Sequence, residues 1–112
     1  MRFFPRIEGD IRVLALVGRL DNLTAPDLDR EVAAVLAGPG RHLVLDVERL
    51  DYVGSMGLRG VLGAVKRLAG MKERLAVAGA NPSVAEVLEI AGFKTLVEMR
   101  ESRAAAVAAL AG

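Results

Sequence analysis

The sequence contains no cysteine and a single histidine, His42. Without cysteine, a disulfide scaffold, a thiolate metal site and a cysteine nucleophile are all excluded, and one histidine cannot form a histidine-based metal cluster. Charge of one sign is not in excess either, since 15 basic and 14 acidic side chains leave a net charge of +1. This balance argues against a nucleic-acid-binding protein that depends on phosphate contacts. We therefore expect no metal, no cofactor and no nucleic-acid partner.

Long apolar segments are also absent. The longest run without a charged residue covers 75–85 and is interrupted by Asn81 and Pro82, whereas a transmembrane helix needs about 20 mostly apolar residues. Four charged residues among the first ten leave no room for the apolar core of a signal peptide. We therefore expect a cytoplasmic protein that does not insert into a membrane.

What the sequence does contain is enough apolar material for one folded domain. Its length of 112 residues is typical of one domain and not two, so we expect a single domain over 1–112. Apolar residues make up 53% of the chain, which excludes intrinsic disorder.

Turn residues divide the chain into short strands and helices. Runs rich in Val and Leu are typical of strands buried on both faces, and apolar residues spaced three and four apart are typical of helices. A strand that ends at Gly18 and a polar loop between 48 and 53 are part of this prediction. The predicted strands are 3–7, 11–17, 42–47, 75–78 and 95–99, and the predicted helices begin near 25, 55, 82 and 102.

Strands that alternate with helices imply crossover connections and a largely parallel sheet. The first two strands are the exception, because the turn Glu8-Gly9-Asp10 between them predicts a hairpin. The expected fold class is α/β: a small, mostly parallel sheet with an antiparallel N-terminal edge strand, covered by about four helices.

The most informative segment is 45–60, in which a buried strand leads through a loop into Gly54-Ser55-Met56-Gly57 at the start of a helix. Ser55 is expected at the N-cap, near the positive end of the helix dipole and beside unpaired backbone N–H groups. The simplest interpretation is that its hydroxyl only caps the helix. Thr24 is expected to cap the preceding helix in the same way.

Two enzymatic or ligand-binding interpretations of this segment fit poorly. A hydrolase nucleophile elbow requires Gly-x-Ser-x-Gly and a later histidine, but Val53 stands two residues before Ser55 and the only histidine precedes it. The glycines at 54, 57 and 60 do not match the dinucleotide pattern, and no Gly-Lys-Ser/Thr follows. Weak phosphate affinity at the helix N-terminus stays open, so a nucleotide-binding module is a minor alternative.

A phosphoacceptor is the remaining interpretation of Ser55. A phosphate there would add about −1.5 to −2 charges, which the positive end of the helix would tolerate. The surface around it would change from apolar to anionic. Such a change describes a switch that needs no catalytic residue in this chain.

The whole chain resembles a STAS domain (sulfate transporter and anti-sigma factor antagonist) of the stand-alone antagonist type. Gly18-Arg19-Leu20-Asp21, followed by Thr24-Ala25-Pro26, is similar to the family's Gly-x-Leu-Asp loop before its first helix. Leu45-Asp46, leading into Ser55-Met56-Gly57-Leu58, is similar to the family's Asp-Ser-Ser-Gly-Leu or Ser-Ser-Ala-Gly-Leu pattern.

The resemblance implies a non-enzymatic, partner-switching function. An antagonist of this family binds an anti-sigma factor serine kinase while unphosphorylated, phosphorylation at the position of Ser55 releases it, and a serine phosphatase resets it. The partner-binding face is expected on the strand-to-helix loop, the first turns of the following helix and the Asp21 loop. Its residues are Asp21, Thr24, Gly54, Ser55, Met56, Gly57 and Arg59.

The sequence departs from the family pattern at two positions, and several roles stay open. Gly54 stands where the family often has Asp or Ser, and Met56 where it has Ser or Ala. Met56 is interpreted as an exposed anchor for the partner or as half-buried filler. Asp21 either assists phosphorylation or binds the amides of its own loop. Asp46 is expected at a strand end near Asp21.

A different class of function is the main alternative. The chain would then be a STAS adaptor subunit of a membrane lipid or anion transporter, and Ser55 would merely cap its helix. The partner distinguishes the two functions, because an adaptor binds a transporter ATPase and an antagonist binds a soluble kinase.

Overall fold

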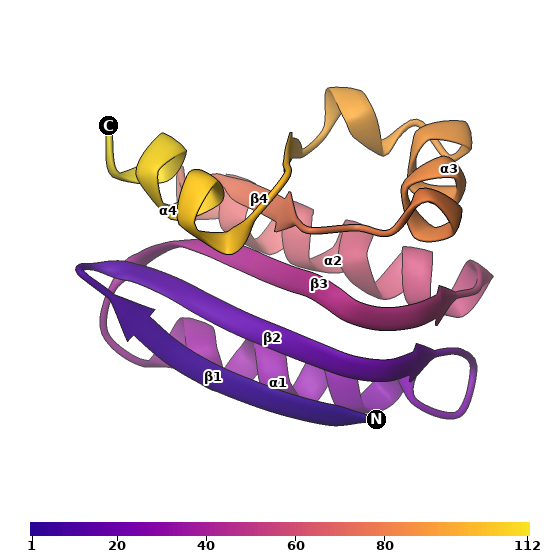
Figure 1. Cartoon of the computed structure of the whole chain (residues 1–112). Helices are drawn as coiled ribbons and strands as arrows, with labels where there is room; N and C mark the ends of the chain where they lie inside the picture. The colour runs from indigo at the N-terminus through magenta and orange to yellow at the C-terminus, as the bar shows by residue number, and fades with distance from the viewer.

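Five strands form one sheet in which every strand pairs with its neighbours in sequence order (Figure 1). In this computed structural model, which describes residues 1–112, β1 pairs antiparallel with β2 and all later pairs are parallel. The predicted parallel sheet with an antiparallel N-terminal edge is confirmed. The strands are β1 (Arg2–Glu8), β2 (Ile11–Leu20), β3 (Arg41–Val53), β4 (Leu75–Ala78) and β5 (Glu98–Arg100).

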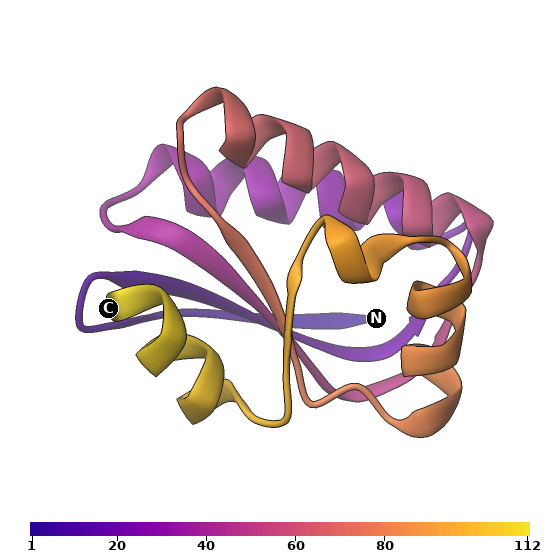
Figure 2. The same cartoon turned by 90° about the horizontal axis from the view of Figure 1, so that it is seen from above.

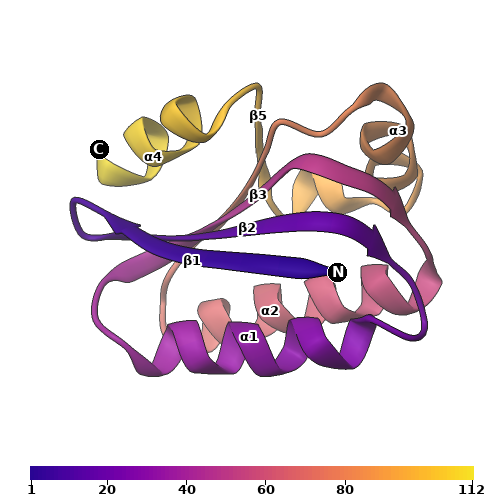
Figure 3. The same ribbon diagram turned by 60° about the horizontal axis from the view of Figure 1, so that its bottom comes forward.

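Four helices cover the sheet, as predicted. In Figure 3, α1 and α2 lie side by side on one face of the sheet, and α4 lies on the opposite face. Seen from above in Figure 2, α3 and α4 occupy opposite ends of the molecule. None of the helices combines the length and the apolar character needed to cross a bilayer. The helices are α1 (Ala25–Ala37), α2 (Ser55–Gly70), α3 (Pro82–Ile90) and α4 (Arg103–Ala111).

The central strands are buried on both faces, which explains why they are apolar throughout. Side chains alternate along a strand, so Leu14 and Leu45 enter the larger core beneath α1 and α2. Val13 and Val44 point to the other face and pack with Leu110 of α4 in a smaller core. The sheet therefore has one apolar core on each face.

Both central strands extend further than predicted. β2 continues past Gly18 to Leu20, and the predicted loop 48–53 is the second half of β3. Its buried residues Val47, Leu50 and Val53 recur every third position, because the pairing with β2 shifts register in this region. Such bulges insert an extra residue. They interrupt the alternation of buried and exposed side chains by which a strand is recognised in a sequence.

The predicted strand 95–99 is also wrong in its boundaries. A short 3₁₀ helix, Phe93–Thr95, follows α3 and buries the Phe93 ring. β5 begins only at Glu98 and pairs with β4 over three residues. The aromatic side chain is therefore part of the core and not part of the edge strand.

Candidate functional site

The two sequence motifs meet where β2 and β3 end. The register pairs Arg19 with Tyr52 and Leu20 with Val53, and the N–H of Gly54 donates to the carbonyl oxygen of Leu20 at 2.9 Å. Because parallel strands end at the same edge of a sheet, the loops that follow them are neighbours. The loop after β2 and the start of α2 therefore form one surface.

Gly57 allows this junction to close. A Cβ at Gly57 would lie 2.7 Å from Leu20 Cγ and 2.8 Å from the Leu20 carbonyl oxygen. No larger residue fits without displacing the end of β2 or the start of α2. Gly57 is buried, so its place in the predicted partner-binding set is beneath the surface, where it positions its neighbours.

Ser55 is the first residue of α2, and the prediction that it is the N-cap is wrong. The N-cap is Gly54, in an extended conformation with φ −103° and ψ −176°, and no side chain caps the helix. The cap lies one residue earlier because the extended backbone persists through Gly54. Ser55 is exposed, and its hydroxyl makes no capping hydrogen bond at the start of α2.

Asp21 holds its own loop in shape. Its Oδ1 accepts hydrogen bonds from the N–H groups of Leu23 at 3.0 Å and Thr24 at 3.1 Å. Partial desolvation acts to raise the pKa of Asp21, but the hydrogen bonds from Thr24 and Leu23 outweigh it and leave the pKa below its ordinary value. The carboxylate is therefore ionised at neutral pH, and its hydrogen bonds fix the loop that adjoins Ser55.

Thr24 strengthens the same loop and does not cap α1 with its side chain. It occupies the N-cap position, yet its hydroxyl makes no capping hydrogen bond. The hydroxyl instead donates to the carbonyl oxygen of Arg19 at 2.7 Å and accepts from the N–H of Asp21 at 2.9 Å. The prediction that the Thr24 side chain caps α1 is wrong, because its hydroxyl is hydrogen-bonded to the end of β2 instead.

The start of α2 and the loop after β2 both carry exposed apolar side chains. Met56 is 40% exposed, and Leu23 in the neighbouring loop is 82% exposed. Arg59 is also exposed, one helical turn after Ser55. The sequence prediction missed Leu23, although an apolar residue within the polar segment Asp21-Asn22-Leu23-Thr24 is a visible signal.

Tyr52 packs over the backbone that leads into Ser55. A Cβ at Gly54 would lie 3.0 Å from Tyr52 Oη and 3.2 Å from Tyr52 Cε2. On the ring of Tyr52, the guanidinium carbon of Arg19 lies 4.3 Å from the centroid. A side chain at position 54, one of the two departures from the family pattern, would therefore require a small shift of the exposed Tyr52 ring.

Asp46 does not belong to this site. It pairs with Ala15 and Ala78 in the middle of β3, whereas the end of β3 is at Val53 beside Leu20. Its Oδ1 accepts a hydrogen bond from the N–H of Glu48 at 3.2 Å. The expected position near Asp21 is wrong, because β3 continues beyond the boundary predicted at Val47.

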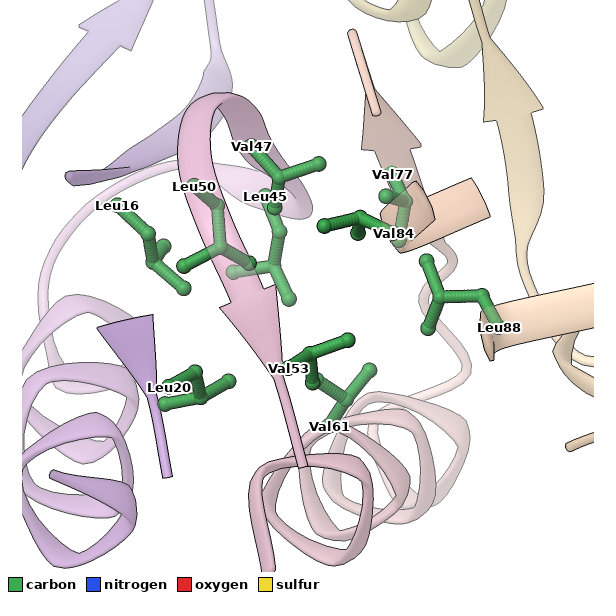
Figure 4. Close-up of a pocket in the computed structure, with 10 residues that line it drawn as sticks. All are labelled: Leu16, Leu20, Leu45, Val47, Leu50, Val53, Val61, Val77, Val84 and Leu88. Atoms are coloured by element: carbon green, nitrogen blue, oxygen red, sulfur yellow. The ribbon is translucent and has the colours of Figure 1, made fainter. Parts of the chain in front are cut away.

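The core beneath the site contains a small cavity of about 10 Å³ (Figure 4). A cavity of this size holds at most one water molecule, and water there would need polar partners. All lining side chains are apolar, so the cavity is a packing gap and not a ligand site. They are Leu16, Leu20, Leu45, Val47, Leu50, Val53, Val61, Val77, Val84 and Leu88.

Comparison with protein families and sequences identifies similar proteins along most of the chain. The family model described as "Mlab, STAS domain" matches residues 3–98. BtrV of Bordetella bronchiseptica, provisionally named as an anti-sigma factor antagonist, is 38% identical over 104 residues, which cover 93% of this chain and 89% of BtrV. The anti-sigma-B factor antagonist of Staphylococcus aureus is 27% identical over 84 residues, covering 75% of this chain and 78% of that protein.

Solved structures share the fold at lower identity. An anti-sigma factor antagonist from Mycobacterium paratuberculosis superposes with a TM-score of 0.91 at 22% identity, covering 99% of this chain and 94% of that one. The phosphorylated form of the Bacillus cell fate determinant SpoIIAA gives 0.73 at 20% identity, covering 95% and 96%. The mouse anion transporter Slc26a9 gives 0.80 at 14% identity, covering 91% of this chain and 18% of the transporter.

Proposed function

Because the chain belongs to the STAS domain family of anti-sigma factor antagonists, we propose that it is a partner-switching regulator controlled by phosphorylation of Ser55. In the unphosphorylated state it binds an anti-sigma factor serine kinase and thereby releases the sigma factor. Phosphorylation of Ser55 by that kinase ends the complex, and a serine phosphatase restores the binding form.

The observation that carries this proposal is the state of Ser55 itself. Its side chain is exposed, stands at the first position of α2 and caps no helix. An exposed hydroxyl is accessible to a kinase. Because this hydroxyl does not cap α2, its modification removes no capping hydrogen bond from the helix. The positive end of the helix dipole also tolerates the added charge.

The surroundings of Ser55 suit a surface that changes its partner on phosphorylation. Met56, the next residue after Ser55, and Leu23, in the loop after β2, both expose apolar area, and burial of such area favours association. A phosphate dianion that enters this interface without a partner group costs several kcal/mol of desolvation, as an order of magnitude. The same surface therefore binds before phosphorylation and is released after it.

A serine hydrolase mechanism does not fit the geometry. The only histidine is the second residue of β3, and Ser55 follows the opposite end of that strand. A serine nucleophile needs a base within hydrogen-bond reach, and His42 cannot provide it. The role proposed for Ser55 is accordingly that of a phosphate acceptor for a separate kinase and not that of a catalytic nucleophile of this chain.

Phosphopeptide mass spectrometry on the protein from its own cells tests the proposal. We expect a phosphate on Ser55 in growing, stressed or stationary cells, and none in a Ser55→Ala variant expressed at the same level. Ser83 and Ser102 serve as internal controls because both are exposed serines elsewhere in the chain.

The absence of phosphate on Ser55 under every condition would contradict the proposal. The adaptor alternative would then predict that the chain purifies together with a transporter ATPase. The match to one segment of the mouse anion transporter is compatible with that alternative at the level of the fold alone.

A further inference from the structure

The chain contains four methionines and no cysteine, so thioether groups supply all of its sulfur chemistry. Met56 is 40% exposed and Met71 is 41% exposed, whereas Met1 and Met99 are partly buried and pack against the larger core. Peroxides convert accessible methionine to methionine sulfoxide, which turns a flexible apolar side chain into a polar one. Oxidation of the folded protein is therefore expected first at Met56 and Met71.

These two methionines lie at opposite ends of α2. Met56 is the second residue of the helix and directly follows Ser55, and Met71 is the C-cap. Because a helix rises about 1.5 Å per residue, the two positions are roughly 22 Å apart along its axis. The two side chains are equally exposed, but only Met56 belongs to the surface that is proposed to bind the partner.

Met56 supplies the apolar contact area at the start of α2. Ser55 before it is polar, and Gly57 after it is buried and has no side chain. Leu58 is only partly exposed and packs against the larger core. A sulfoxide oxygen on Met56 would bring a polar group into the contact with the partner, and burial of a polar group without a hydrogen-bond partner opposes association.

We propose that Met56 is an oxidation site within the partner-binding surface, and that its conversion to methionine sulfoxide weakens partner binding without phosphorylation of Ser55. This inference rests on the proposed function, since that function defines the surface. The serine or alanine of the family pattern at this position has no sulfur to oxidise. Met56 therefore gives this chain a second chemical input at the same surface.

The oxidant is a peroxide, and hydrogen peroxide is the simplest case. A lone pair of the Met56 sulfur attacks one peroxide oxygen, so that an S–O bond forms and the O–O bond breaks. The departing hydroxide takes the proton from the transferred oxygen and leaves as water. Sulfur loses two electrons and the peroxide gains them. Methionine sulfoxide reductases reverse the step, one enzyme for each sulfoxide epimer, at the expense of a thiol.

The test measures the affinity for the purified anti-sigma factor kinase from the protein's own cells, before and after treatment of the full chain with hydrogen peroxide. Peptide mass spectrometry verifies that Met56 and Met71 carry the added oxygen. We expect the treated protein to bind at least about 5-fold more weakly. Repair with both reductases should restore the affinity.

Met56→Leu and Met71→Leu separate the two ends of the helix, and each variant is compared with its own untreated form. Met56→Leu should show the same affinity before and after peroxide, because leucine has no sulfur. Met71→Leu is the matched control, and it should lose as much affinity on treatment as the parent protein. Circular dichroism of each treated form confirms that the fold is retained.

Three results would overturn the inference. They are equal affinity of the treated and untreated parent protein, an equal loss in Met56→Leu, and a Met56 that stays unmodified while Met71 is oxidised. Failure of the untreated protein to bind the kinase would be a different result, because it would contradict the proposed function and this inference with it. Binding that survives oxidation would leave the proposed function standing.

Discussion

Gly57 shows how a single missing side chain holds the site together. α2 can start against the end of β2 only because no Cβ occupies the space beside Leu20. Gly63 lies in the same helix, and a Cβ there would meet nothing within 4 Å. The two glycines have opposite consequences although they belong to one element.

We predict that Gly57→Ala lowers the free energy of unfolding by about 1–3 kcal/mol, because the added methyl group overpacks the junction. Gly63→Ala should raise the free energy of unfolding by up to about 1 kcal/mol, since alanine is the better helix former. Urea unfolding of both variants measures the difference. Equal changes in both would mean that helix propensity alone governs position 57.

His42 is a buried imidazole at the other end of β3. Its Nδ1 accepts a hydrogen bond from the N–H of Arg74 at 2.9 Å, and its Nε2 lies 3.2 Å from the Arg41 guanidinium group. Burial lowers the pKa of His42 below 6.5, the positive charges of Arg41 and Arg74 lower it further, and Glu73 and Asp10 oppose the shift. The folded protein therefore favours neutral His42.

A pH dependence of stability follows from this shift. Below about pH 6.5 the unfolded chain takes up a proton that the folded chain resists, so the free energy of unfolding falls as the pH decreases toward the lower folded pKa. We expect urea unfolding to show this loss as the pH falls below about 6.5, and His42→Gln to remove most of it. The carboxylates with lowered pKa values, Asp10, Asp21 and Glu98, titrate in a more acidic range. An unchanged slope in His42→Gln would contradict the assignment.

At the scale of elements, the helix starts differ in how they are capped. Asn81 caps α3, because its Oδ1 accepts from the N–H of Val84 at 2.8 Å, and its Nδ2 also donates to the carbonyl oxygen of Leu50. α2 has no side-chain cap at all. Serine at position 55 is thus not explained by the stability of its helix.

We predict that Ser55→Ala changes the free energy of unfolding by less than about 0.5 kcal/mol, whereas Asn81→Ala lowers it by about 1–2 kcal/mol. Thermal or urea unfolding of the two variants provides the comparison. A large loss in Ser55→Ala would show that the hydroxyl has a structural role after all.

The elements also show what the sequence could predict and what it could not. Helical spacing and turn residues placed all four helices, and the hairpin at Gly9 predicted the antiparallel edge. The end of β3 was not predicted. Register shifts separate its buried residues Val47, Leu50 and Val53 by three positions instead of the two expected for a strand. That error placed Asp46 at the end of a strand, whereas it lies in the middle of β3.

The candidate site was predictable in part for the same physical reason. Each loop motif was recognisable in one continuous segment, whereas the stack of Arg19 on Tyr52 depends on the pairing of two strands. The cap at Gly54 depends on one backbone conformation that the residue types do not specify. Cross-strand contacts of this kind become visible only once the register is known.

At the scale of the whole molecule, the Ser55 site and the end of α4 lie at opposite ends of the sheet (Figure 1). The guanidinium groups of Arg41 and Arg74 reach the carbonyl oxygens of Ala111 and Ala109 near the end of α4. A charge at Ser55 therefore acts on a surface that is remote from this contact. The account predicts a change of binding without a change of fold.

The most direct test compares the affinity for the cognate anti-sigma factor kinase before and after Ser55 is modified. We expect the protein phosphorylated at Ser55 to bind at least about 100-fold more weakly than the unmodified protein, equivalent to about 2.7 kcal/mol, and Ser55→Asp to lose part of that affinity. Both forms should unfold at nearly the same temperature. Equal affinity of the phosphorylated and unmodified proteins would contradict the switch.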